Sequence, residues 1–147
     1  METKPFVFEK TFDAPASNVW KAITQTELLR QWFWDVPEFE PRVGFEFGFE
    51  SQSCEEGNIH LCKVTEVIPE KKLAYSWRYP GYEGDSLVIF ELFEEGKNRT
   101  RLRLTHAGLE TFPRNLMAKK GIAEGWSYLI STSLQNFLEK DLTQSIS

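Results

Sequence analysis

The stretch that decides the fold is residues 117–141, which read MAKKGIAEGWSYLISTSLQNFLEKD. Apolar or small residues recur there in steps of three and four, which is the spacing of one face of an α-helix. The remaining positions are largely charged or polar. At 1.5 Å per residue such a helix is over ~30 Å long, so it needs a large partner surface. The expected inner face consists of Ile122, Trp126, Leu129, Ser133, Phe137 and Leu138.

Two glycines interrupt this helix at positions that share a face. Gly121 and Gly125 are four residues apart, and each costs a helix about 1 kcal/mol relative to alanine. One interpretation is that they let another element approach closely. The other is that they leave room beside Trp126 for a ligand. The spacing alone does not decide between the two.

Upstream of residue 117, short segments alternate apolar and polar residues, which is typical of half-buried strands. A first short helix should carry Val19, Trp20 and Ile23, and a second should start at Thr26, whose hydroxyl can cap it. The alternation slips at Thr65-Glu66, which indicates a β-bulge. The expected strands are Pro5–Asp13, Phe45–Glu50, Asn58–Val67, Leu73–Tyr79, Asp85–Phe93 and Leu102–His106.

Short turns join the later strands, so the sheet should be antiparallel. The concave side of a curled sheet is the available partner for the long helix. The sequence therefore predicts an α+β domain, with a curved antiparallel sheet of about six strands wrapped around a long C-terminal helix. Two short helices should follow the first strand. The length of 147 residues suits a single domain over residues 1–147.

Composition excludes several classes of function. The net charge is −5 without a basic stripe, which disfavours nucleic-acid binding, because phosphate contacts carry most of that affinity. No apolar run reaches the ~20 residues of a membrane span, and Met1–Pro5 lacks the apolar core of a signal peptide. We therefore expect a cytoplasmic protein. Arg99, Arg101 and Arg103 should form an outward stripe that pairs with Glu91 or its neighbours, or an acidic-partner docking face.

The order of elements and several local motifs resemble the START-like, or helix-grip, superfamily. Within it they resemble the branch related to the heat-shock-protein-90 ATPase activator. The resemblance implies a curved sheet that grips the C-terminal helix, often with a cavity between them. It also implies a carrier or sensor of apolar small molecules, a pocket enzyme such as a cyclase, or a co-chaperone domain. The matching motifs are Phe12–Pro15, Val19–Thr24, Leu28–Trp32, Val43-Gly44, Val64–Leu73, Tyr75–Trp77, Thr100–Leu109 and Gly125-Trp126.

Aromatic residues make up 14% of the chain, and they suit either a solid core or the lining of a ligand cavity. We expect the candidate ligand-binding residues to face the space between sheet and helix. Trp77 and Trp126 should face that space, and Trp32 should lie near its mouth. The candidates are Trp32, Trp34, Phe45, Phe47, Phe49, Tyr75, Trp77, Val88, Phe90, Leu104, His106, Gly125, Trp126, Leu129 and Ser133.

His106 is the titratable residue of most interest, because it should share the inner strand face with Leu102 and Leu104. It could orient a polar ligand group or act as a base, or it could simply bond backbone or water near the strand end. Its place at that end suggests that folding does not need it. No serine or cysteine is visibly paired with it, so a nucleophilic triad is unsupported.

Metal binding is the weakest of the chemical readings. His60 and Cys62 share a strand face and Cys54 is near in sequence, but they lack the spacing of a zinc site. We predict no catalytic residue, no metal and no cofactor.

The leading hypothesis is a non-enzymatic domain that binds a small apolar or amphipathic molecule between sheet and helix. The second is a protein-interaction domain akin to the chaperone activators, with a chaperone or other protein as partner. The third is a pocket enzyme that uses His106 as its acid or base.

Overall fold

Six antiparallel strands form one open sheet in the order β1-β6-β5-β4-β3-β2. The computed structural model describes residues 5–33, 36, 38–50, 59–114 and 122–146, leaving aside the side chains of Glu50 and of 141–146. The sheet predicted from the alternation is confirmed, and each expected strand is present. The strands are β1 (Phe6–Phe12), β2 (Glu46–Glu50), β3 (Ile59–Ile68), β4 (Lys72–Arg78), β5 (Ser86–Gly96) and β6 (Arg99–Ala107).

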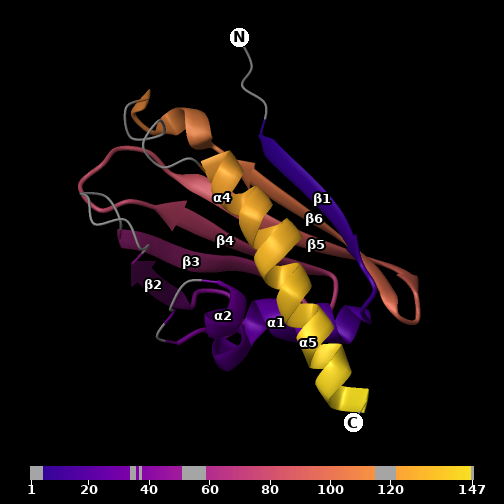
Figure 1. Ribbon diagram of the computed structural model, residues 1–147. Coiled ribbons are helices and arrows are strands. Elements are labelled where there is room, and N and C mark those ends of the chain that lie inside the picture. Colours follow the sequence, from indigo (N-terminus) through magenta and orange to yellow (C-terminus); the bar gives the residue numbers. More distant parts are fainter. Residues whose placement is uncertain (1–4, 34–35, 37, 51–58, 115–121, 147) are drawn as a thin grey trace.

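The C-terminal helix lies across one face of this sheet (Figure 1). It consists of α4 (Ile122–Tyr128), a π-helical segment η2 (Leu129–Leu134) and α5 (Gln135–Ile146). The two short helices, α1 (Ala16–Thr24) and α2 (Thr26–Trp32), cover the same face beside the lower part of the long helix. This arrangement is the helix-grip architecture that the sequence predicted.

Strand alternation explains why the face under the helix is apolar. Along β3, His60, Cys62 and Val64 are buried, while Leu61 and Lys63 between them are exposed. The pairing with β4 shifts between Val64 and Glu66, which confirms the predicted bulge. A bulge adds one unpaired residue and bends the strand, so it supports the curvature that the helix needs.

The π-helical segment changes which residue of the long helix faces the sheet. The helical spacing predicted Ser133 on the inner face, yet Leu134 is fully buried there and Ser133 is only half-buried. The i→i+5 bonding of a π-turn adds a residue to the turn and so shifts the face by one position. The Ser131 hydroxyl donates to the Ser127 carbonyl at the start of this segment, where it competes with the backbone ladder. Trp126, Leu129, Phe137 and Leu138 are buried as predicted.

The predicted cap of α2 is wrong. The N-cap residue is Gln25, and its side chain makes no capping hydrogen bond. The Thr26 hydroxyl instead donates to the Phe39 carbonyl and accepts from the Phe39 backbone N–H. A side chain of the helix thus holds a loop 13 residues away in sequence, and it places the Phe39 ring in the core.

The arginine stripe on the outer face of the sheet is paired within the chain. Arg101 and Arg103 both contact the Glu9 carboxylate across the β1–β6 pair, and Arg103 also faces Glu91 at 3.9 Å. Their guanidinium groups lie over the Phe93 ring. The hydrogen bond from Arg103 lowers the pKa of Glu9. Cross-strand pairing, one of the two interpretations of this stripe, is therefore confirmed for these two arginines.

The complete burial of Leu134 predicts that shortening its side chain destabilises the fold. Leu134→Ala should lower the free energy of unfolding by about 2–5 kcal/mol, because it leaves a void in a close-packed contact. Thr132→Ala, two residues earlier on the exposed side of the helix, should change it by less than about 0.5 kcal/mol. Urea denaturation of both variants measures the difference. Equal small losses would mean that Leu134 is not close-packed in the core.

Candidate functional site

A chain of hydrogen bonds joins the long helix to three strands through His106. The indole Nε1–H of Trp126 donates to His106 Nδ1 at 3.0 Å. His106 Nε2 lies 2.9 Å from Ser86 Oγ, and Ser86 Oγ donates to the Trp77 carbonyl at 2.8 Å. The chain therefore runs from α4 to β6, to β5 and to β4.

The donors in this chain assign the proton on His106. An indole N–H can only donate, so Nδ1 of His106 must be the unprotonated nitrogen. In the neutral ring the proton then sits on Nε2, which donates to Ser86 Oγ. Each hydroxyl and ring nitrogen in the chain has a defined role, as polar groups buried at this depth require.

Burial keeps the His106 ring neutral. The side chain is 0% exposed, and desolvation, with a smaller effect of His60, lowers its pKa from 6.5 to about 3. A group with this pKa and with both nitrogens engaged is a poor proton carrier at neutral pH. It is also a cross-link between helix and sheet, which opposes the expectation that folding does not need it.

A close turn positions the strand end that carries His106. Gly108 adopts φ 87°, and a Cβ there would lie 2.8 Å from the Asp85 carbonyl. The Thr111 hydroxyl accepts from the Asp85 backbone N–H, and its single proton lies within reach of the Gly108 carbonyl at 2.6 Å and the Asp85 carbonyl at 2.8 Å. This turn holds the start of β5, and so Ser86, against the end of β6.

Aromatic rings surround Trp126 on the sheet side and on the α2 side. We call Phe33, Phe49, His60, Trp77, His106 and Trp126 the Trp126 cluster. Trp77 lies 5.5 Å from Trp126 between ring centroids, and the Phe49 ring meets Trp77 edge-on at 5.5 Å. His60 stacks on Phe49 at 4.6 Å with an angle of 6°.

Phe33 closes this cluster from α2. Its ring stacks on Trp126 at a centroid distance of 5.9 Å and an angle of 21°, and it meets Phe49 edge-on at 5.3 Å. Sequence reasoning left out Phe33, His60 and Ser86 as site residues. The aromatic run around Phe33 was visible, but only the fold shows which ring turns inward.

A second aromatic group lies toward β2. Phe39 meets Phe47 edge-on at 5.0 Å, and Phe47 meets Tyr75 at 5.1 Å, with Phe45 half-buried at the rim. Burial raises the pKa of Tyr75 well above its usual value. Phe90 bridges the two groups, because its ring lies 6.0 Å from Tyr75 and 5.9 Å from Trp126.

The remaining candidates differ in burial and in their contacts. Val88, Leu104 and Leu129 are buried core residues, and Trp32 is buried with its indole donating to the Ala22 carbonyl at 2.8 Å. Gly125 is half-buried, and a Cβ built on it would meet no described atom within 4 Å apart from the neighbouring backbone of its own helix. Ser133 donates to the Trp32 carbonyl at 2.6 Å. Trp34 and Gly121 lie outside the described residues.

The interior around the Trp126 cluster is uncharged. Among the described side chains, no Asp, Glu, Lys or Arg is buried. The buried polar side chains in that part of the chain are Thr24, His60, Ser86, Thr100 and His106. Burying a charged group without a partner costs free energy, so this interior favours uncharged ligands.

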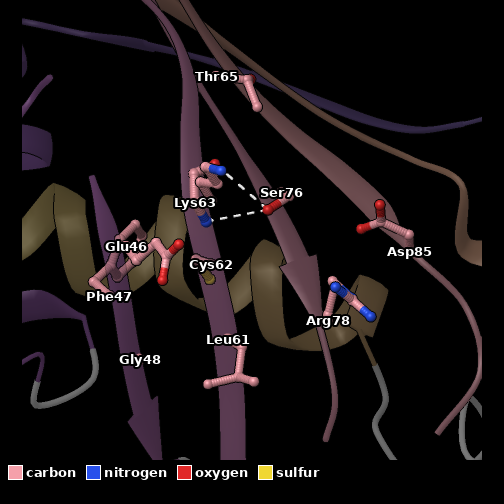
Figure 2. Close-up of a pocket in the computed structure, with 10 residues that line it drawn as sticks. All are labelled: Glu46, Phe47, Gly48, Leu61, Cys62, Lys63, Thr65, Ser76, Arg78 and Asp85. Atoms are coloured by element: carbon pink, nitrogen blue, oxygen red, sulfur yellow. Dashed lines mark hydrogen bonds between the residues drawn. The ribbon is translucent and has the colours of Figure 1, made fainter. Parts of the chain in front are cut away.

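A separate groove lies on the face of the sheet that is turned away from the helix. It has a volume of about 660 Å³ and opens between the outer side chains of β2, β3 and β4 (Figure 2). On its β4 side, the Ser76 hydroxyl is hydrogen-bonded to the backbone of Lys63 on β3. Two acidic side chains, Glu46 and Asp85, and two basic ones, Lys63 and Arg78, line it around the exposed Leu61.

Cys62 is a buried free thiol, and desolvation raises its pKa. Cys54 lies outside the described residues. Within the described ranges, no three His, Cys, Asp or Glu side chains come close enough together to hold a metal ion. In the same residues, no helix has the length and apolarity of a membrane span.

The gripped helix and its aromatic wall define a domain of the START-like, helix-grip class. The model of the family described as activator of Hsp90 ATPase homolog 1-like protein matches residues 13–139. The match covers most of the chain, so the chain belongs to this family, as its sequence motifs predicted. No curated protein matches the chain significantly.

Solved structures with the same fold span almost the whole chain. MLL2253 from Mesorhizobium loti is 28% identical with a TM-score of 0.77, over 93% of this chain and 98% of that one. CalU16 from Micromonospora echinospora is 25% identical with a TM-score of 0.71, over 95% and 79%. DynU16, a protein of the dynemicin biosynthetic locus, is 21% identical with a TM-score of 0.74, over 94% of this chain but 48% of that one.

The lowered pKa of His106 predicts a pH dependence of stability. Between about pH 6.5 and pH 3, His106 binds a proton in the unfolded chain but stays unprotonated in the folded chain. Stability therefore falls as the pH falls through this window. Wild type should lose up to roughly 1 kcal/mol more per pH unit than His106→Gln, which has nothing to titrate there. Urea denaturation at pH 7, 6, 5 and 4 measures both slopes.

The carboxylates, including Glu9, titrate alike in the two proteins and cancel in the comparison. Parallel slopes would show that His106 is not held neutral in the fold.

Proposed function

We propose that this domain binds a small apolar or amphipathic molecule between the sheet and the N-terminal half of the long helix. The observation that carries the proposal is the Trp126 cluster, an uncharged aromatic wall built from both layers. Ligand sites are mostly apolar and aromatic with a few placed polar groups, and this cluster has that composition. The His106 hydrogen bonds fix the Trp126 ring against the sheet, so this part of the wall loses little order on binding.

The open space at Gly125 supports a way in next to Trp126. Gly125 is half-buried, and a Cβ built on it would meet no described atom within 4 Å apart from the neighbouring backbone of its own helix. Further along the same helix, the Ser133 hydroxyl donates to the Trp32 carbonyl and so holds α2 beside it. Of the two interpretations of the helix glycines, room beside Trp126 is therefore favoured for Gly125.

Energetics limit the ligand to one with a polar anchor. Burying ~200 Å² of apolar ligand surface contributes about 5 kcal/mol, and association costs at least ~4 kcal/mol. Micromolar affinity, about −8 kcal/mol, thus needs a larger ligand together with one or two hydrogen bonds. The Ser133 hydroxyl oxygen, which already donates to Trp32, has lone pairs that can accept one.

A pocket enzyme is not favoured, because both ring nitrogens of His106 already make structural hydrogen bonds. Protein interaction is the second candidate function, and the outer groove around Leu61 gives it a location (Figure 2). The family description supplies the partner to test, an Hsp90-type chaperone. A cytoplasmic location stays a prediction.

The ligand proposal predicts the effect of filling the space at Gly125. Titration with fatty alcohols, sterols and naphthols should change tryptophan emission saturably in wild type for at least one class. Gly125→Leu should weaken that binding at least tenfold without lowering the melting temperature, because the new side chain enters open space. Ala123→Leu, on the exposed side of the same helix, is the matched control and should bind as wild type does. Equal binding by all three proteins would remove the site from this face.

The second candidate function, protein interaction, predicts that a substitution on the outer face of the sheet abolishes activity. Addition of the domain to a purified Hsp90-type chaperone should raise its ATPase rate, and Leu61→Glu on the outer face should abolish the rise. The same variant should keep wild-type ligand binding, because Leu61 points away from the helix. If the ATPase rate does not change, the ligand proposal stands alone.

A further inference from the structure

We propose that the Phe33 ring is a placeholder for a flat ring of the ligand. The ligand is then an uncharged molecule with a planar aromatic ring, which displaces Phe33 and stacks on Trp126. This inference rests on the proposed function and specifies the chemistry of the same site.

We call the space that the Phe33 ring now fills, between Trp126 and Phe49, the seat. The Phe33 ring lies nearly parallel to Trp126, with 21° between the planes and 5.9 Å between the centroids. Phe49 meets it edge-on at 5.3 Å, and the Trp32 ring lies 5.4 Å away at a tilt of 50°. Stacked and edge-on neighbours suit an aromatic ring, because the ring faces are negative and the edges positive. A saturated ring of the same size cannot use these contacts.

Phe33 differs from the two rings that form its seat. Trp126 is 2% exposed and hydrogen-bonded through its indole to His106, and Phe49 is 4% exposed within the sheet. Phe33 belongs to neither layer, follows the end of α2 and is half-buried. Its displacement exposes only the part of the ring that water does not already reach, while the walls stay in place.

The backbone beside Phe33 is held on both sides. The Phe33 backbone N–H donates to the Leu29 carbonyl at 2.7 Å, and the Trp32 carbonyl accepts from Ser133 at 2.6 Å. The Trp32 indole is fixed to α1. Release of the seat therefore needs rotation of the Phe33 side chain and no movement of α2.

The seat also selects against charge. His106 is neutral and both its nitrogens are engaged, and no described acidic or basic side chain is buried near the ring. A sulfonate or carboxylate on the ligand ring would lose its hydration without gaining a partner.

Isothermal titration calorimetry with three probes tests these statements. The probes are 2-naphthol, its saturated analogue decahydro-2-naphthol, and 2-naphthalenesulfonate, each titrated into the full chain. Wild type should bind 2-naphthol at least tenfold more tightly than either of the other two. Phe33→Ala should bind it at least threefold more tightly than wild type, because the seat is already empty. Phe8→Ala removes another half-buried phenylalanine, on β1, and should leave binding unchanged.

Phe33→Leu gives the same test if the alanine variant does not fold, since it keeps apolar bulk and loses the flat ring. It should also bind 2-naphthol more tightly than wild type. Weaker binding by either Phe33 variant would show that Phe33 is a wall of the site, and the placeholder would be wrong. Binding of decahydro-2-naphthol as tight as 2-naphthol would overturn the planar ligand and leave the proposed function intact. Tight binding of the sulfonate would overturn the uncharged ligand alone. If none of the probes and no member of the apolar panel binds, both proposals fail.

Discussion

The hydrogen bond from the Trp126 indole to His106 is the constraint on which the interior depends. It ties the N-terminal half of the long helix to the sheet, and Ser86 passes the connection on to the Trp77 carbonyl. Leaving a buried donor without an acceptor costs more free energy of folding than a formed hydrogen bond contributes. These hydrogen-bonded positions therefore tolerate few substitutions. The orientation of Trp126, and with it the aromatic wall, follows from this bond.

A second connection fixes the same helix lower down, where Ser133 meets the Trp32 carbonyl. Ser133 lies within the π-helical segment and meets α2, while its neighbour Leu134 is fully buried in the core. Phe33 lies between these two points, next to a fixed backbone and against a fixed ring. The proposed seat is thus a consequence of how the helix is gripped at two levels. The groove around Leu61 lies on the opposite face of the sheet and is independent of both connections.

The elements of the fold could be predicted because burial patterns are local in sequence. Phe45, Phe47 and Phe49 alternate with polar or small residues, and the face of Trp126, Leu129 and Phe137 has helical spacing. The π-turn could not be predicted, since Ser133 and Leu134 both suit a position near the inner face. The partners of His106 come from α4 and β5, so only the tertiary structure reveals them. Thr26 looked like a cap because its local context fits one, but a loop 13 residues away competes for its hydroxyl.

The proton position on His106 is the most direct test of this account. The chain has two histidines, so long-range proton–nitrogen correlation spectra of histidine-labelled protein, with His60→Gln as the assignment control, resolve the His106 ring. At pH 7 the account predicts a neutral ring, with Nδ1 in the pyridine-type range and Nε2 in the pyrrole-type range, unchanged down to about pH 5. An imidazolium, the opposite tautomer, or averaged shifts from exchange between tautomers would contradict it, because Trp126 could not then donate to a fixed acceptor.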